Sequence, residues 1–294
     1  MSRSRARCFV LWLLLVAPPA ALAAQEAPGG TLAGVEITPD VVYGHKDGMA
    51  LTFDVFRPEN AHGGAVLYMV SGGWFSRWTP PETLARRSFT GLLEKGFTVL
   101  AVRHGSAPRY HVPDAEADVR RALRYVRLHA GDLGIDTARI GVYGGSAGGH
   151  LSLMLGLVSD DGQRGAEDPV LATPSRVAAV VAYYPPVDLR QIVGPSERFP
   201  ALDFDPELAP SISPILYASP DDPPTLLIHG DADRLVNIRN SEIMYAALRE
   251  AAVETEFVTI PGGDHGFSRP ADRARAQELM AEWFDRHIGR GAAH

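Results

Sequence analysis

The sequence predicts an α/β fold with a mostly parallel central sheet and helices on both faces. Three observations support this fold class. Short apolar runs recur along the chain, each about as long as a buried strand and bounded by glycine, proline or polar residues. Segments with helical spacing of apolar residues lie between these runs. Most of the runs are apolar throughout rather than at alternate positions, which is typical of parallel strands that are covered on both faces.

The predicted elements alternate regularly after an initial group of strands. Early strands are predicted over residues 35–37, 41–43 and 50–56, with a turn at Lys46-Asp47-Gly48 between the last two. Further strands are predicted over residues 65–70, 97–102, 139–143, 177–183, 225–228 and 256–260. Helices are predicted over residues 81–95, 113–131, 147–158, 238–251 and 272–288. Residues 159–176 are polar and are expected to form a surface loop.

One long segment, residues 185–224, interrupts the alternation of strands and helices. It is rich in proline and has few runs that could form a long helix. An unstructured connection of this length is uncommon in a compact domain, so we expect a small cap over the site rather than a disordered insertion. The apolar residues that such a cap would bury are Phe199, Leu202, Phe204, Leu208, Ile212, Ile215 and Leu216.

Residues 1–24 have the pattern of a secretory signal peptide. Three arginines precede an apolar run from Phe9 to Val16, and Ala21-Leu22-Ala23 matches an A-x-A cleavage site. The apolar run is well short of the roughly 20 residues that a transmembrane helix needs. The sequence therefore predicts an exported protein, periplasmic or secreted, that keeps no stable membrane anchor after processing. Residues 25–34 are expected to be a flexible leader, and residues 35–294 the folded domain.

Composition argues against several classes of site. The only cysteine, Cys8, lies in the predicted signal peptide, so the mature chain would have no disulfide, thiolate metal site or cysteine nucleophile. The 28 basic and 35 acidic residues give a net charge of −7, which becomes about −10 without the three arginines of the signal peptide. This acidity argues against binding to nucleic acid or to an anionic membrane. No metal-binding spacing is present, so we predict neither a metal nor a cofactor.

A glycine-flanked serine is the strongest chemical signal in the chain. Gly144, Ser146 and Gly148 form a G-x-S-x-G pattern between a predicted buried strand and a predicted buried helix. In this setting the serine occupies a sharp, strained turn, where small neighbours allow close packing and the hydroxyl is exposed. The amide of Ala147 then points to where an oxyanion would form. Taken alone, the pattern could also be a Gly/Ser-rich turn without chemistry.

A serine nucleophile needs a histidine to take its proton. Among the 10 histidines, His265 is the best placed, because it lies in a glycine-containing loop, residues 261–267, between the last predicted strand and the closing helix. An acid that orients this histidine is expected between the serine and the histidine in chain order. Asp231 and Asp233 follow a predicted buried strand, and their spacing does not choose between them. His229, at the end of that strand, is expected to support the turn.

Several motifs between residues 40 and 288 are shared with one large group of enzymes. They are Gly-Gly-Ser-Ala-Gly-Gly-His-Leu at 144–151, Leu-Gly-Ile-Asp-Thr-Ala-Arg-Ile at 133–140, Ser213-Pro214-Ile215, Asp222-Pro223-Pro224, His229-Gly230-Asp231-Ala232-Asp233 and residues 263–267. The chain resembles the α/β-hydrolase superfamily, specifically its acetyl esterase-like branch of esterases and lipases related to hormone-sensitive lipase. It also has some likeness to prolyl-oligopeptidase-type catalytic domains. In relatives with a His-Gly-x-x-Asp turn the acid comes four residues after the histidine, so the resemblance implies Asp233 and leaves Asp231 as the alternative.

One motif departs from the pattern of this branch. Its members usually have His-Gly-Gly-Gly-Trp after the third strand, where backbone amides complete the oxyanion hole. Aligned on Trp74, this chain has Val70-Ser71-Gly72-Gly73-Trp74, so the histidine and the first glycine are replaced. The resemblance implies that the amides of Gly72, Gly73 or Trp74 converge with the amide of Ala147. Losing one such donor typically raises the barrier by about 3–4 kcal/mol, so the integrity of the oxyanion hole is expected to affect the rate more than any surface feature.

The expected function is hydrolysis of a small-molecule carboxylic ester by an exported serine hydrolase. Ser146 would attack the carbonyl, His265 would transfer the proton and Asp233 would orient His265. Alternatives are a serine peptidase of the prolyl-oligopeptidase type, which usually carries a large propeller domain, and a non-catalytic binding protein with the same fold. Aromatic residues near the site suggest an acetylated or feruloylated plant carbohydrate as substrate, although they could equally pack against the cap. They are Trp74, Phe75 and Trp78.

Overall fold

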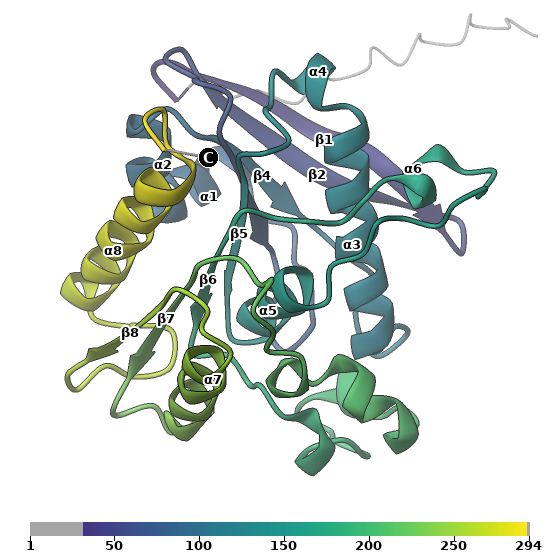
Figure 1. Ribbon diagram of the computed structural model, residues 1–294, viewed down its shortest axis with the longest axis vertical. Helices are drawn as coiled ribbons and strands as arrows, with labels where there is room; N and C mark the ends of the chain where they lie inside the picture. The colour runs from purple at the N-terminus through teal and green to yellow at the C-terminus, as the bar shows by residue number, and fades with distance from the viewer. Residues whose placement is uncertain (1–31, 293–294) are drawn as a thin grey trace, which may run out of the picture. The chain divides into compact units, whose positions relative to one another are not determined.

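An eight-stranded sheet lies at the centre of the computed structural model, which describes residues 32–292 (Figure 1). The strands are β1 (Val35–Lys46), β2 (Met49–Pro58), β3 (Ala65–Met69), β4 (Thr98–Val102), β5 (Ile140–Gly145), β6 (Ala179–Tyr183), β7 (Thr225–Gly230) and β8 (Thr255–Ile260). Their order in the sheet is β1-β2-β4-β3-β5-β6-β7-β8. The pairs β1–β2 and β2–β4 are antiparallel, and every other pair is parallel. The predicted mostly parallel sheet is therefore confirmed.

Helices cover both faces of the sheet, and each face has its own hydrophobic core (Figure 1). One face packs against α1 (Pro81–Ser88), α2 (Thr90–Glu94) and α8 (Pro270–Ile288), and the other against α3 (Val112–Leu128), α5 (Ala147–Leu157) and α7 (Arg239–Glu250). Two short helices, α4 (Ala130–Leu133) and α6 (Pro169–Ala172), lie in connections. Successive residues of β5 point to opposite faces, since Val142 belongs to the core under α5 and Tyr143 to the core under α8.

The structure joins or divides some of the predicted elements. The two strands predicted over 35–37 and 41–43 are one bulged strand, β1. Asp40 lies at the first bulge with φ 53°, and its amide donates to Asp54 Oδ1 on β2, so pairing continues through the irregular point. The helix predicted over 81–95 is divided into α1 and α2 at Phe89. The Phe89 ring is fully buried, and packing of this ring takes precedence over a continuous helix.

The segment over residues 185–224 contains only 3-10 turns, at Leu189–Gln191, Pro200–Leu202, Pro206–Ile212 and Pro214–Leu216. Proline at the start of three of these turns explains why no long helix forms. Leu202 and Ile212 are buried in the core shared with α5, whereas Leu208 and Leu216 stay exposed. Phe199 lies against the loop that follows β3, since a Cβ added to Gly73 would be 3.1 Å from its ring. Part of the segment thus packs beside the predicted oxyanion loop.

The N-terminal predictions concern a part of the chain that the structure does not describe. Residues 1–24, the predicted signal peptide, and residues 25–31 of the predicted leader lie outside the described residues. The described part begins with a turn in which the Val35 amide donates to the Leu32 carbonyl. Between residues 32 and 292, none of the helices is both long and apolar enough to cross a bilayer.

Candidate active site

Ser146 lies at the sharp turn between β5 and α5. Its backbone has φ 55° and ψ −120°, a conformation that is strained for any residue with a Cβ. Two hydrogen bonds hold the turn. The Ser146 amide donates to the Tyr183 carbonyl at 2.9 Å, and the His150 amide donates to the Ser146 carbonyl at 2.9 Å. The Ser146 side chain lines a cavity at the carboxyl ends of β3, β5 and β6, where ligands bind in parallel sheets of this type.

The flanking glycines are required because backbone segments approach each other closely at this turn. A Cβ added to Gly144 would lie 2.5 Å from the carbonyl carbon of Gly148. A Cβ added to Gly148 would lie 2.8 Å from the carbonyl oxygen of Met69 at the end of β3. Backbone atoms cannot rotate away as a side chain would, so larger residues would displace Ser146 relative to β3.

Asp233 and His265 are brought together from two loops at the end of the sheet. Asp233 follows β7 and His265 follows β8, and His265 Nδ1 donates to Asp233 Oδ2 at 2.7 Å. The Asp233 side chain is fully buried, whereas His265 is 21% exposed. Because Nδ1 donates to the carboxylate, the Nε2 atom of His265 is left as an unprotonated base. Asp231 instead accepts a hydrogen bond from the Gly262 amide at 2.6 Å and makes no hydrogen bond to His265 in the described chain.

The Asp233 carboxylate is held by a set of donors in its own turn. Its Oδ1 atom accepts from the amides of Leu235 and Val236, at 2.8 and 3.0 Å. His229 is fully buried, and its Nε2 donates to the Val236 carbonyl at 2.9 Å while lying 3.3 Å from Asp233 Oδ2. Burial lowers the pKa of His229, which favours its neutral form. His229 therefore supports the turn, as the sequence predicts.

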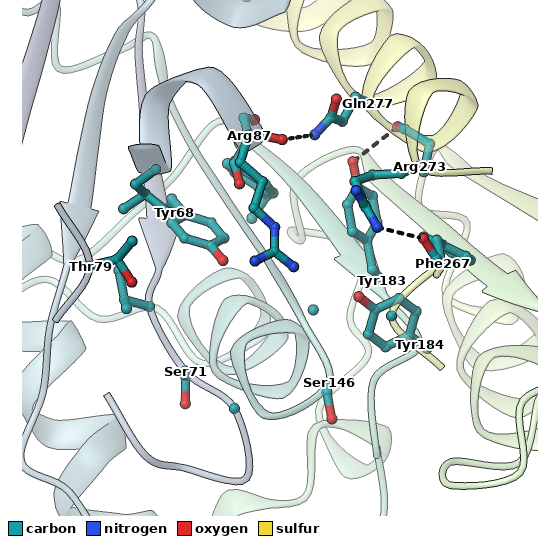
Figure 2. Close-up of a pocket in the computed structure, with 18 of the residues that line it drawn as sticks. Tyr68, Ser71, Thr79, Arg87, Ser146, Tyr183, Tyr184, Phe267, Arg273 and Gln277 are labelled. Atoms are coloured by element: carbon teal, nitrogen blue, oxygen red, sulfur yellow. Dashed lines mark hydrogen bonds between the residues drawn. The ribbon is translucent and has the colours of Figure 1, made fainter. Parts of the chain in front are cut away.

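Ser146 and His265 line the same cavity, which has a volume of about 540 Å³ (Figure 2). The ring of Tyr184 lies 4.6 Å from the His265 ring, centroid to centroid. Burial raises the pKa of Tyr184, so its hydroxyl stays protonated at neutral pH. The other lining residues are Tyr68, Val70, Ser71, Gly72, Phe75, Arg77, Thr79, Thr83, Leu84, Arg87, Ser88, Tyr143, Gly145, Tyr183, Gly266, Phe267, Arg273, Ala276 and Gln277.

The loop after β3 carries three of the predicted oxyanion donors, the amides of Gly72, Gly73 and Trp74. The Gly72 amide donates to the Phe75 carbonyl at 3.0 Å, and the Phe75 amide donates back to the Gly72 carbonyl at 3.1 Å. This closed turn engages the Gly72 N–H in the described conformation, so its role as an oxyanion donor stays a prediction. Gly73 and Trp74 form the turn with φ 59° and 58°. Within residues 32–292 their amides have no hydrogen-bond acceptor, and the same holds for the amide of Ala147 at the first position of α5.

Trp74 is buried rather than beside the cavity, and its partner His150 was not assigned a role from the sequence. The Trp74 Nε1 atom donates to His150 Nδ1 at 3.3 Å. His150 Nε2 lies 2.7 Å from the Ile212 carbonyl. An indole nitrogen only donates, so His150 must carry its proton on Nε2 and donate it to Ile212. His150 thus ties the helix after Ser146 to the loop after β3 and to the 185–224 segment.

A second buried histidine supports the same loop from the other side. His104 Nδ1 lies 2.7 Å from the Gly105 carbonyl, so Nδ1 donates and Nε2 accepts from Ser71 Oγ at 2.9 Å. Burial lowers the pKa of His104, which keeps this arrangement neutral. Ser71 stands where the related branch has a glycine of its oxyanion motif, and its side chain is fixed by this bond. The supporting role of His104 could be recognised only from its hydrogen bond to Ser71, a residue far from it in sequence.

The described residues offer no metal centre, since no group of three or more His, Cys, Asp or Glu side chains between residues 32 and 292 could hold an ion. The cavity instead presents a serine on a strained turn and a histidine polarised by a buried carboxylate. Such groups can form and hydrolyse an acyl-serine when a carbonyl carbon lies next to the serine oxygen.

Comparison with known families is consistent with this geometry. The model of the BD-FAE family matches residues 53–248, which is most of the described chain. The chain belongs to the BD-FAE family. Among curated proteins, this BD-FAE chain is 31% identical to Esterase LipQ of Mycobacterium tuberculosis over 251 residues, which cover 80% of the chain and 58% of LipQ. The chain therefore spans about three fifths of the length of that relative.

Two solved structures have the same architecture, and each aligns with this chain over almost its full length. A truncated carbohydrate esterase from gut microbiota superposes on the BD-FAE chain with a TM-score of 0.72 and 28% identity, over 86% of this chain and 97% of the other. The acetyl ester-xyloside bifunctional hydrolase of Caldicellulosiruptor lactoaceticus gives a TM-score of 0.72 and 25% identity, over 84% and 95%. The resemblance to α/β-hydrolase esterases and the predicted fold class are confirmed.

Proposed function

We propose that this protein is a serine esterase that hydrolyses carboxylic esters through an acyl-enzyme. The observation that supports this function most strongly is the bond between Asp233 and His265, because it engages Nδ1 and leaves Nε2 as the base of a residue that lines the same cavity as Ser146. The relatives named esterases and hydrolases support the same chemistry. The two alternative functions are a serine peptidase and a non-catalytic binding protein, and the experiments below distinguish them from an esterase.

The mechanism assigns one role to each group. Ser146 Oγ attacks the ester carbonyl while His265 Nε2 takes its proton, and Asp233 stabilises the imidazolium that forms. The amides of Ala147 and Gly73, with Trp74 as the alternative to Gly73, donate to the oxyanion. His265 then returns the proton to the alcohol oxygen, and the alcohol leaves. Water repeats the sequence on the acyl-serine and releases the carboxylic acid.

Hydrolysis of 4-nitrophenyl acetate and labelling by a fluorophosphonate probe test the assignment together. Substitution of Ser146→Ala should reduce the hydrolysis rate by at least about 10⁴-fold and abolish labelling. Ser211→Ala is the matched control, because Ser211 is exposed in the 185–224 segment and bonds only the Leu208 carbonyl among described residues. Labelling of the wild type without ester turnover, combined with cleavage of a proline-containing peptide amide, would favour the peptidase. Absence of both labelling and turnover would favour the binding protein.

An acetylated carbohydrate is the substrate class that we propose. The support comes from the names of two structural neighbours, a carbohydrate esterase and an acetyl ester-xyloside hydrolase. Hydroxyl-bearing residues of the cavity, including Tyr68, Thr79 and Tyr184, could pair with sugar hydroxyls. Release of acetate from acetylated xylo-oligosaccharides, with kcat/KM above that for 4-nitrophenyl acetate, would support this class. A preference for long-chain acyl esters or for methyl ferulate would replace it.

We also propose that the protein is exported and cleaved after residue 23 or 24. The support is the pattern of residues 1–24, with its arginines, apolar run and A-x-A site. Expression of the full chain in a bacterium, cell fractionation and N-terminal sequencing of the product test this directly. A product that begins at Ala24 or Gln25 outside the cytoplasm is expected. A full-length product that stays in the cytoplasm would contradict export.

A further inference from the structure

The cavity beside Ser146 is cationic although the chain as a whole is acidic. Its lining includes three arginines and contains no aspartate or glutamate, whereas the chain has 35 acidic and 28 basic residues. The arginines are Arg77, Arg87 and Arg273. A cavity lined by charges of one sign focuses the electrostatic potential and raises the local concentration of ligands with the opposite charge. The arrangement therefore favours a ligand with a negative group.

Arg87 is the arginine most available to such a ligand. Figure 2 shows its guanidinium extending from α1 into the cavity, and it makes no hydrogen bond to the other residues drawn there. Its contact with Gln277 uses only the Arg87 backbone carbonyl, which accepts at 2.7 Å. By contrast, the Arg273 guanidinium donates to the carbonyls of Phe267 and Ser268, both at 3.3 Å, and so supports the loop that carries His265.

Two tyrosine hydroxyls complete this side of the cavity. Neither Tyr68 nor Tyr184 has a hydrogen bond from its hydroxyl to any residue between 32 and 292, and both residues line the cavity. Burial raises the pKa of each, so both hydroxyls can donate at neutral pH. The positive charge of Arg87 opposes this rise at both tyrosines. Arg87, Tyr68 and Tyr184 line the same cavity, and Figure 2 shows the Arg87 guanidinium on the side of the cavity where the two tyrosine side chains lie. A guanidinium beside neutral hydroxyl donors matches the geometry of a carboxylate.

We propose that Arg87 binds a carboxylate on the substrate, so that the enzyme prefers esters whose acyl or alcohol part carries a negative charge, such as an acidic sugar or a dicarboxylic half-ester. This inference rests on the proposed esterase function and adds a specificity determinant to it. The carboxylate accepts two hydrogen bonds from the guanidinium and further ones from the tyrosine hydroxyls. No bond is made or broken at this end of the substrate, so Arg87 is a binding residue.

Two pairs of esters measure the preference on the acyl side and on the alcohol side. The acyl pair is the mono-4-nitrophenyl ester of adipic acid and its neutral half-amide. The alcohol pair is 3-acetoxybenzoate and 3-acetoxybenzamide. In each pair the amide has nearly the same shape as the carboxylate but no charge. We expect kcat/KM for the charged ester to exceed that of its amide by about tenfold in one pair at low salt. Because Arg87 is exposed, salt should reduce this ratio.

Substitutions of Arg87 test whether the preference for the charged ester depends on this residue. Arg87→Gln should reduce the ratio about tenfold, and Arg87→Lys should restore part of it because the positive charge is kept. Arg86→Gln is the matched control, since Arg86 is a neighbouring exposed arginine on α1 that does not line the cavity. It should leave both the ratio and the basal rate unchanged. A wild-type ratio near one in both pairs, or an equal fall in the Arg87→Gln and Arg86→Gln variants, would overturn the proposal.

A binding measurement separates failure of this inference from failure of the proposed function. Calorimetric titration of the Ser146→Ala variant with 3-acetoxybenzoate and with 3-acetoxybenzamide requires no turnover. If neutral esters are hydrolysed but charge brings no advantage in turnover or binding, the esterase stands and the role of Arg87 fails. If no ester is hydrolysed and the charged ligand still binds more tightly, weakened by Arg87→Gln, the anion site stands without the esterase.

Discussion

Asp233 Oδ2 accepts a hydrogen bond of 2.7 Å from His265 Nδ1, and the Asp233 side chain has no contact with solvent. Asp231, two residues earlier, is exposed and accepts from the backbone of Gly262 instead. The two aspartates therefore differ in their hydrogen-bond partners. One is positioned to fix the tautomer of the histidine, and the other only anchors the loop.

Asp233→Asn should therefore lower kcat for 4-nitrophenyl acetate by about 10⁴-fold, because an amide can donate to Nδ1 and stabilise the wrong tautomer. Asp231→Asn keeps the Oδ1 acceptor for Gly262 and should retain most of the wild-type rate. Initial rates and circular dichroism of both variants measure the difference. Equal losses in folded Asp233→Asn and Asp231→Asn proteins would remove Asp233 from its role.

The strained backbone at Ser146 predicts a gain in stability when the side chain is deleted. Ser146→Gly should raise the free energy of unfolding by about 1 kcal/mol, because glycine adopts φ 55° and ψ −120° without a Cβ clash. Ser146→Ala keeps the Cβ and should show no comparable gain, while both variants are inactive. Urea unfolding at neutral pH compares the two. Finding the glycine variant less stable than the alanine variant would show that the turn stores no strain.

Close backbone packing predicts different outcomes for two helical glycines. Gly148→Ala places a Cβ 2.8 Å from the Met69 carbonyl oxygen and should destabilise the protein by about 1–3 kcal/mol, with a loss of activity as Ser146 shifts. Gly91→Ala in α2 places a Cβ 3.5 Å from Ala281 Cβ, an ordinary contact, and should be neutral or slightly stabilising. Thermal unfolding and ester turnover measure both variants. Similar effects of the two substitutions would contradict the packing argument.

The burial of His150 predicts that the protein is less stable in mildly acidic solution than at neutral pH. Burial lowers its pKa from 6.5 to about 4, so between these values the unfolded chain binds a proton that the folded chain does not. This contribution to the free energy of unfolding is complete above about pH 6.5 and decreases as the pH falls toward 4. The total loss is about 3 kcal/mol for a shift of this size. The physical event is loss of the acceptor for Trp74 Nε1.

Urea unfolding at pH 7 and at pH 5 tests this for the wild type and for His150→Gln. The glutamine variant should be less stable at pH 7 but should lose less stability on acidification. The comparison is needed because burial also lowers the pKa of His104 and His229, which contribute in the same direction. An identical pH dependence in the two proteins would mean that His150 is not protonated in this range.

Patterns within short stretches of sequence were sufficient to predict the sheet, most of the helices and the turn at Ser146. Buried strands read as continuous apolar runs because both faces of a parallel sheet are covered, and the G-x-S-x-G spacing reflects backbone approach inside one turn. The position of His265 also followed from order along the chain, because the loop after the last strand must end near the serine turn. The strands, the helices and the serine turn depend on residues that are close in sequence.

The remaining features of the site depend on residues that are far apart in sequence. The choice of Asp233 over Asp231 depends on which carboxylate the loop after β8 meets. The Trp74 side chain turns inward to His150, which comes 76 residues later in the chain.

The same is true of the cationic cavity. Arg87 lies on α1 and Arg273 on α8, far apart in sequence, and packing of both helices on one face of the sheet places both arginines in the cavity that Ser146 lines. Hydrogen bonds and charge depend on separation in space, which a linear pattern does not specify. The candidate nucleophile could therefore be found from local sequence alone, whereas the carboxylate that bonds His265, the partners of the loop after β3 and the charge of the cavity depend on tertiary structure.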